Sequence, residues 1–278
     1  MNESKKAEIA FFHIDDDGWI LGNDAARGPW TANGCHGGPV AGILSRAAEQ
    51  AVPNKQLVRI TIDLCRPVPL DGFKINYFNT HDGRNISRGS LELRNKKDSL
   101  CAIATALFLP SEDIGSVRTT EIETLKFSEA SAFSFPKIIA SHGLPTFADY
   151  VELASQGEFK NGPNTIWMKA PRLISSEAPS GFQSICPLAD CCNGFSRNEE
   201  VQSVSFINPD LNIQLHRLPT SDWIGANFSS QWEKNGIGLA SALLFDDEGP
   251  IGSAQQIVFL QRQNQISRPP YEINFNNS

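Results

Sequence analysis

The chain carries one order of elements twice, a helix followed by four strand-like runs. In the first half, residues 35–50 read as a glycine-rich turn that leads into a helix, because apolar side chains recur there at i, i+3, i+4 and i+7. In the second half a shorter helix is predicted over Phe182 to Asn193, with Gly194 as its stop. The strand-like runs are 57–68, 73–77, 86–94 and 100–109 after the first helix, and 201–216, 223–231, 238–245 and 251–261 after the second. An internal duplication of about 110 to 130 residues is the simplest explanation.

The alternation of side chains predicts how the runs lie in a sheet. Residues 57–68 alternate apolar and polar, which is typical of a strand with one buried face, whereas 100–109 is apolar on both faces, as in a central strand. Before the first helix, Asp17-Gly18 between two apolar runs predicts a hairpin. The aspartates of this turn lack the remaining ligand spacing of an EF-hand loop, so a solvated turn is preferred to a calcium site. Each half is therefore expected to be an α+β unit, an antiparallel meander packed on one helix.

The turn before the first helix contains His36, Gly37, Gly38 and then Pro39. The two glycines are expected to let the turn adopt φ > 0 and to leave the backbone bare for a ligand. Pro39 fits the first helical turn, where its missing N–H is not needed. A helix that begins in this way can receive a polar carbonyl or a phosphate at its N-terminus. Small residues such as Gly42 predict close packing against a sheet. A plain turn before a core helix explains the stretch equally well.

The regular pattern lapses between the two halves and again after the second. Residues 110 to about 147 carry Ser, Glu, Thr and Pro and are interpreted as a linker that crosses the surface. We predict an N-terminal unit over 1–112, a linker over 113–147, a C-terminal unit over 148–263 and a polar, extended tail over 264–278.

Composition and charge exclude several classes of function. The formal net charge is −7 and no basic run exceeds two residues, so nucleic acid is not expected as the main partner. No apolar run reaches the length of a membrane span, and the N-terminus lacks the apolar core of a secretory signal. The six cysteines form no C-x-x-C pair and are interpreted as free thiols in a reducing, cytoplasmic compartment. Neither a Walker nor a Rossmann glycine pattern nor metal-ligand spacing occurs, so no cofactor and no metal are predicted.

Several segments together resemble a known family. They are the His36-Gly37-Gly38 turn into its helix, the strand 59–64 with Arg66-Pro67 at its end, the stretch 210–219 followed by Trp223, and the stretch 247–256 that ends in glutamine. These segments resemble the acyl-CoA thioesterase II type of the thioesterase-like superfamily, over roughly residues 10–262. The resemblance implies a double hotdog, in which two antiparallel sheets are each wrapped on a central helix.

The resemblance also implies a mechanism without a serine or cysteine nucleophile. In that family a water is held by an Asp, a Thr or Ser, and a Gln, and it attacks the thioester carbonyl of an acyl-CoA substrate. Asp190 matches the family's Asp and Gln256 its Gln, but the hydroxyl position falls at Asn208, which has no hydroxyl. Ser205 and Ser203 are the alternative hydroxyls. Two hypotheses follow: an acyl-CoA thioesterase that uses Asp190 and Gln256, and a binding protein of the same fold that does not hydrolyse its acyl thioester.

The same residues can be weighed by their chemistry alone. Thioester hydrolysis needs an acceptor for a proton of water and donors for the developing oxyanion. Asp190 lies in an apolar stretch with no Lys or Arg within six residues, which favours a functional carboxylate. Gln256 follows another glutamine, so strand alternation directs one of the two inward. His36 is a candidate oxyanion donor or base, and together with Gly37 and Gly38 it is predicted to bind substrate.

Other interpretations are weaker. Cys191-Cys192 suggests a thiol nucleophile, but no partner is identifiable and buried cysteines are the preferred explanation. A hotdog dehydratase would use a histidine and an acidic residue, but His36 lacks the spacing of that class to a later glycine and proline. His216 is interpreted as structural, and Asp63 and Arg66 as residues that shape the sheet and its turn. Two units in one chain mimic a dimer of single units, so a monomer can be complete, and a homo-oligomer is left open.

Overall fold

The fold is described from a computed structural model that covers residues 9–133, 137–140, 142–200, 203–262 and 271–274. The first half contains β1 (Ala10–Ile14), β2 (Ile20–Gly22), the 3-10 turn η1 (Asp24–Ala26), α2 (Gly37–Ala51), β3 (Gln56–Leu64), β4 (Phe73–Asp82), β5 (Ser87–Asn95) and β6 (Leu100–Leu109). The second half contains β9 (Glu152–Ser155), β10 (Asn164–Lys169), β11 (Arg172–Ile174), α3 (Gly181–Ala189), α4 (Cys192–Ser196), β12 (Val204–Ile207), β13 (Asp210–Leu215), β14 (Ile224–Trp232), β15 (Ile237–Asp246) and β16 (Gly249–Arg262). The predicted order of one helical segment and then a meander is present in both halves.

All these strands form one continuous sheet rather than two, together with β7 (Ser131–Phe133). Its order is β11-β1-β2-β4-β5-β6-β3-β13-β16-β15-β14-β10-β9-β7, and β12 pairs with β16 beside this path. The two halves join where β3 and β13 pair antiparallel, with Thr61 opposite Asn212, and the Thr61 hydroxyl donates to the Asn212 side-chain oxygen at 3.1 Å. On either side of this junction the strand order is mirrored, as expected of a duplication. The prediction of two separate sheets missed this pairing, which occupies an edge that each half would otherwise leave open.

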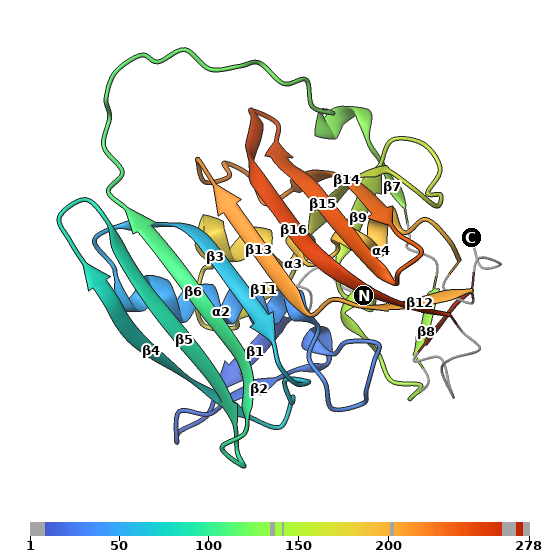
Figure 1. The fold of residues 1–278 in the computed structure, drawn as a ribbon, viewed down its shortest axis with the longest axis horizontal. Coiled ribbons are helices and arrows are strands. Elements are labelled where there is room, and N and C mark those ends of the chain that lie inside the picture. Colours follow the sequence, from blue (N-terminus) through green and yellow to red (C-terminus); the bar gives the residue numbers. More distant parts are fainter. Residues whose placement is uncertain (1–8, 134–136, 141, 201–202, 263–270, 275–278) are drawn as a thin grey trace.

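The helices lie together on one face of the sheet (Figure 1). A Cβ added at Gly38 would lie 2.8 Å from the Cα of Pro187, and one added at Gly42 would lie 2.9 Å from the Cδ1 of Leu173. Pro187 belongs to α3 and Leu173 to β11, so the glycines of α2 face the second half of the chain. The sequence correctly predicted a helix with a small-residue face. That face allows the two halves to approach closely, and α2 also packs on β3 and β4 of its own half.

The second helical segment differs from its prediction. It is divided into α3 and α4 at Asp190 and Cys191, and Gly194 lies inside α4 rather than ending a helix. The backbone amide of Cys191 donates to the carbonyl of Leu188 at 3.0 Å, an i to i−3 bond that tightens the turn at the end of α3. The break therefore places Asp190 at a helix end instead of on a helix surface.

The segment between the halves holds two 3-10 turns and two short strands. These are η2 (Phe127–Glu129), β7 (Ser131–Phe133), β8 (Lys137–Ala140) and η3 (Phe147–Asp149). β7 pairs with β9 in the main sheet, and β8 pairs with β17 (Tyr271–Asn274) from the tail. Residues 110–126 have no regular structure and arch away from the body in Figure 1. Among the described residues, no helix combines the length and apolar character that a membrane crossing needs.

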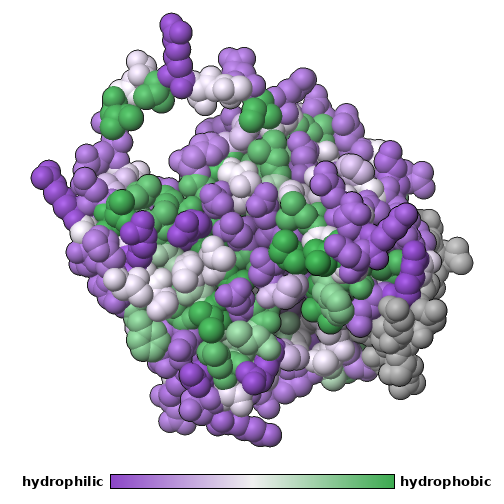
Figure 2. All heavy atoms as spheres, viewed as in Figure 1, coloured by the Kyte–Doolittle hydropathy of each residue, from purple (hydrophilic) through white to green (hydrophobic). Residues whose placement is uncertain are grey.

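The sheet face opposite the helices mixes polar and apolar side chains (Figure 2). Ile237 lies opposite Phe259, Leu239 opposite Ile257, and Ile207 opposite Phe259, and all five side chains are exposed. They form one apolar stripe across neighbouring strands. A stripe of this kind is compatible with association of copies, and the homo-oligomer stays a prediction.

Candidate active site

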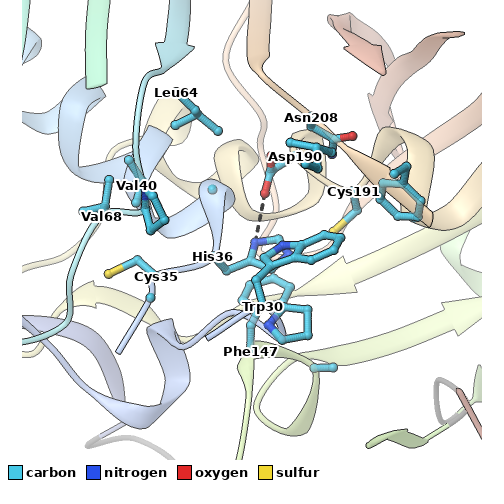
Figure 3. A pocket seen from close by; sticks show the side chains of 18 of the residues that line it. Trp30, Cys35, His36, Val40, Leu64, Val68, Phe147, Asp190, Cys191 and Asn208 are labelled. Carbon is cyan, nitrogen blue, oxygen red and sulfur yellow. Dashed lines mark ion pairs between the residues drawn. The ribbon is translucent and has the colours of Figure 1, made fainter. Parts of the chain in front are cut away.

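A cavity of about 470 Å³ lies where the two halves meet. The first half lines it with Trp30, His36, Gly37 and the end of β3, the segment between the halves with Phe147, and the second half with Asp190, Cys191 and Asn208 (Figure 3). Most of its wall is apolar, and two of its polar side chains, His36 and Asp190, are in contact. An apolar cavity with a few convergent polar side chains is the usual form of a small-molecule site.

His36 comes from the turn before α2 and caps that helix. Its backbone is extended (φ −70°, ψ 141°), as an N-cap requires, and the amide of Gly38 lies 3.2 Å from its Nδ1. The ring stacks on Phe147, with 4.2 Å between ring centres and 14° between ring planes. Figure 3 shows the imidazole between this phenyl ring and Asp190. The stack and the cap fix the ring from two sides.

Asp190 is held by one group from each half of the chain. Its Oδ2 lies 2.9 Å from His36 Nδ1, and its Oδ1 accepts a hydrogen bond of 2.9 Å from Gln256 Nε2. The same amide of Gln256 also donates to the Asp190 backbone carbonyl at 3.1 Å. The Asp190 side chain is 7% exposed. Both carboxylate oxygens are therefore oriented, and each keeps a free lone-pair direction because a carboxylate offers about four.

Gln256 lies inward on β16 and is fully buried, whereas its neighbour Gln255 is exposed. Strand alternation correctly required one glutamine of the pair to point inward. Because both donors of the Gln256 amide are used on Asp190, its Oε1 remains, and this buried atom has no hydrogen-bond partner within the described part of the chain. A buried acceptor without a partner is uncommon and marks a place where a water or a ligand donor can bind.

Glycine at positions 37 and 38 is required by space and not by backbone angle. Gly37 and Gly38 are not among the glycines with positive φ, so the expectation of φ > 0 in this turn is wrong. A Cβ at Gly37 would lie 2.8 Å from both carboxylate oxygens of Asp190. The carboxylate thus rests against the first residue of α2, where the helix dipole favours a negative charge.

Asn208 lies on the connection between β12 and β13 and lines the same cavity. Its Oδ1 is a second buried acceptor without a partner among the described residues. Ser203 and Ser205, which the sequence offered as alternative hydroxyls, are not among the residues that line the cavity. The structure therefore brings His36, Gly37, Asp190 and Asn208 to one cavity, with Gln256 behind Asp190.

Three cysteines also line the cavity, and two of them, Cys35 and Cys191, are poor nucleophiles. Burial raises the pKa of the Cys35 and Cys191 thiols well above the usual range. All six cysteines are free. Because the thiolate is the reactive form, these two buried thiols are inert at neutral pH.

The duplicated positions in the other half do not repeat the constellation. Thr61 and Asn212 face each other across the junction, and counting along the strands from this pair makes Ala106 the counterpart of Gln256. Counting from the two helix caps makes Arg46 the counterpart of Asp190. Neither residue can reproduce the chemistry of the site, so the described residues hold one such constellation.

Comparisons with known proteins agree with this architecture. A family model described as the acyl-CoA thioesterase N-terminal domain matches residues 26–109, and one described as the acyl-CoA thioesterase C-terminal domain matches residues 126–260. No curated protein matches the chain.

The sequence did not predict the contact between His36 and Asp190, nor the stack of Phe147 on His36.

Solved structures share the fold at low sequence identity. A conserved protein of unknown function with hot dog fold from Alicyclobacillus acidocaldarius is 14% identical, with a TM-score of 0.69 over 94% of this chain and 98% of that one. The acyl-CoA thioesterase II TesB2 from Mycobacterium marinum is 12% identical, with a TM-score of 0.66 over 95% and 99%. The tesB protein of Mycobacterium avium subs paratuberculosis is 14% identical, with a TM-score of 0.65 over 93% and 97%. With two family models that together cover most of its length, the chain belongs to the acyl-CoA thioesterase family and is a thioester hydrolase.

Proposed function

We propose that this protein hydrolyses acyl-CoA thioesters by direct attack of water, with the water held by Asp190 and Gln256. One observation carries the proposal: the carboxylate of Asp190, which Gln256 orients, the buried Oδ1 of Asn208 without a partner among the described residues, and the start of α2 meet at one apolar cavity. The apolar wall suits an acyl chain, and the polar end suits the thioester.

Each group has a role that its geometry supports. A free lone pair of Asp190 or the Oε1 of Gln256 can accept one hydrogen of a water, which leaves the second hydrogen for the base. The amide of Gly37, which lines the cavity at the start of α2, can donate to the carbonyl oxygen as it becomes an oxyanion.

The reaction balances without a covalent enzyme intermediate. The water oxygen bonds to the carbonyl carbon, and a proton of the water leaves to a base. The tetrahedral intermediate then loses the thiolate as the C–S bond breaks, and that thiolate takes up a proton. The products are a carboxylic acid and coenzyme A thiol.

Asn208 replaces the hydroxyl that the family's pattern predicts at this position. Its buried Oδ1 has no partner among the described residues, so it can accept a hydrogen from the water as a hydroxyl oxygen would. The alternative, binding of an acyl thioester without hydrolysis, rests on this same departure. Asn208→Thr distinguishes the two, because a binding protein that lacks only its hydroxyl would gain activity.

The test is release of free thiol from a panel of acyl-CoA esters of short to long chain. Wild type is expected to release thiol, and Asp190→Asn is expected to lower kcat/KM by about 10²- to 10⁴-fold. Asp222→Asn, which changes an exposed carboxylate elsewhere, is the control. Thiol release that survives Asp190→Asn would overturn the site. Absence of release by wild type, together with a higher melting temperature in acyl-CoA, would favour binding alone.

The cellular setting and the limits of the two units remain proposals. Free thiols at all six cysteines support a reducing, cytoplasmic compartment. The proposed units are 1–112 and 148–263, and both contribute residues to the cavity.

A further inference from the structure

We propose that His36 is the base that takes the proton from the attacking water, with Asp190 as the group that orients it. This inference deepens the proposed hydrolysis and rests on it. It assigns the proton acceptor, which neither the fold nor the presence of a carboxylate decides.

The contacts of Asp190 determine which nitrogen of His36 carries the proton. An ionised carboxylate only accepts hydrogen bonds, so at 2.9 Å from Oδ2 the Nδ1 of His36 is the donor. The Gly38 amide also points toward Nδ1, but at the longer distance of 3.2 Å. Nδ1 cannot donate to the carboxylate and accept from the amide at once. The shorter, charge-assisted contact is the stronger one, so the Nδ1 proton lies toward Asp190.

The same tautomer decides between the two roles that the sequence left open for His36. With the proton on Nδ1, the neutral ring presents an unprotonated Nε2, which can accept a proton but cannot donate one. His36 is thus a base in the resting state and not an oxyanion donor. After the transfer, Asp190 faces an imidazolium, and the opposite charge stabilises it.

The surroundings favour the imidazole over the carboxylate as the acceptor. The unprotonated Nε2 of His36 has a lone pair free for a proton, whereas both oxygens of the Asp190 carboxylate already contact a hydrogen-bond donor. The stack on Phe147 keeps the ring in place, and the side chain is 18% exposed at the cavity wall. The other charged or titratable groups that line this cavity with His36 are Asp190 on α3, Cys35 on the preceding turn, Cys65 and Arg66 after β3, Cys191 beside α4 and Arg197 after α4.

The proposed step is balanced. Nε2 of His36 takes a proton from the water as its oxygen bonds to the carbonyl carbon. When the C–S bond breaks, the imidazolium returns that proton to the leaving thiolate. The enzyme then regains the neutral ring, and no oxidant, reductant or further reactant is consumed.

The decisive variant is His36→Asn. Asparagine is among the best N-caps, so it preserves the helix start, and its amide can still donate to Asp190, but it cannot take up a proton. His216→Asn changes an exposed histidine directly after β13 that does not line the cavity, and it is the matched control. For each variant, kcat/KM for an acyl-CoA ester is measured from pH 5.5 to 9, together with the melting temperature.

The expected result is a fall of kcat/KM by about 10²- to 10³-fold in His36→Asn. The acid limb of the wild-type pH profile should disappear, and the remaining rate should rise in proportion to hydroxide. If His36→Asn loses stability, His36→Ala gives a second test. Added imidazole should restore part of the rate of His36→Ala but none of the rate of Asp190→Asn.

Two outcomes separate this inference from the function on which it rests. If wild type releases no thiol from any ester, the proposed hydrolysis fails. If wild type is active and His36→Asn keeps its rate and its acid limb, hydrolysis stands, but His36 only caps α2 and the inference is wrong.

Discussion

Replacing Gly37 by alanine tests how closely the site is built against the start of α2. The new Cβ would lie 2.8 Å from both oxygens of the Asp190 carboxylate and 3.0 Å from its Cγ. Ordinary contact begins at 3.4 Å, so the carboxylate must move by at least 0.6 Å. It cannot move freely, because His36 and Gln256 hold its two oxygens.

The displacement should reduce activity more than stability. A misplacement of about 1 Å in a catalytic group costs on the order of 10²-fold in rate, so Gly37→Ala should lose about 10- to 100-fold in kcat/KM. Overpacking costs about 1–3 kcal/mol in a well-packed site. Alanine offsets about 0.5–1 kcal/mol of this because it favours the helix over glycine. With about 2–4 °C per kcal/mol, the melting temperature should fall by less than roughly 10 °C.

Gly42→Ala on the same helix is the matched control. Its Cβ would lie 2.9 Å from the Cδ1 of Leu173, which is the end of a flexible side chain, and no atom of Asp190 is among its nearest neighbours. The two variants should show comparable melting temperatures, but only Gly37→Ala should lose thiol release. Wild-type kcat/KM in Gly37→Ala, measured with the same acyl-CoA ester, would refute the argument that the carboxylate acts from this position.

Two further variants test the support of the site and of the fold. Gln256→Leu removes both hydrogen bonds to Asp190, which leaves buried acceptors bare and should cost about 1–3 kcal/mol. It should also lower kcat/KM at least tenfold, whereas Gln255→Leu, assayed alongside, should not. Burial alone would raise the pKa of Asp246, but hydrogen bonds from Arg217 and two backbone amides hold it at about 2. Since this pKa lies below that of the unfolded chain, Asp246 stabilises the fold above about pH 4, and that stability is lost as the pH falls toward 2. Urea unfolding across this range should show the loss in wild type and a flatter dependence in Asp246→Asn.

Side-chain periodicity predicted the elements but not their partners. The helix over 35–50 and the strand 100–109 follow from local patterns, and the structure has α2 at Gly37–Ala51 and β6 at Leu100–Leu109. The pairing of β3 with β13 has no local signal in the sequence, because polar and apolar side chains alternate in the same way in an edge strand and in a paired strand. The division of the second helix at Asp190 was likewise missed, since Gly194 looked like the stronger stop.

The site shows the same limit more sharply. His36 and Asp190 were each chosen on local grounds, one for a glycine-rich turn and one for a carboxylate in an apolar stretch. Their contact joins opposite halves of the chain, and it depends on the close approach of α2 to the second half that glycine permits. Gly37 illustrates the error in detail: its sequence context suggested a special backbone angle, while its actual requirement is space for a carboxylate from the other half.

The duplication explains why the described residues hold one such constellation and why both halves contribute to it. Two equal units would bring two like constellations together, but Arg46 and Ala106 occupy the counterpart positions. There, Glu49 of α2 accepts hydrogen bonds from Ser180, the cap of α3, and from Gln183. At this second contact between α2 and α3, the described polar groups hydrogen-bond to one another. The contact therefore joins the helices and leaves none of these described groups as an unpaired acceptor. At the other contact, between the start of α2 and the end of α3, His36 and Asp190 meet at a cavity, and Gln256 keeps an acceptor without a partner among the described residues. The contact around Glu49 thus holds α2 against α3, whereas the contact between His36 and Asp190 borders the cavity in which we propose that the substrate binds.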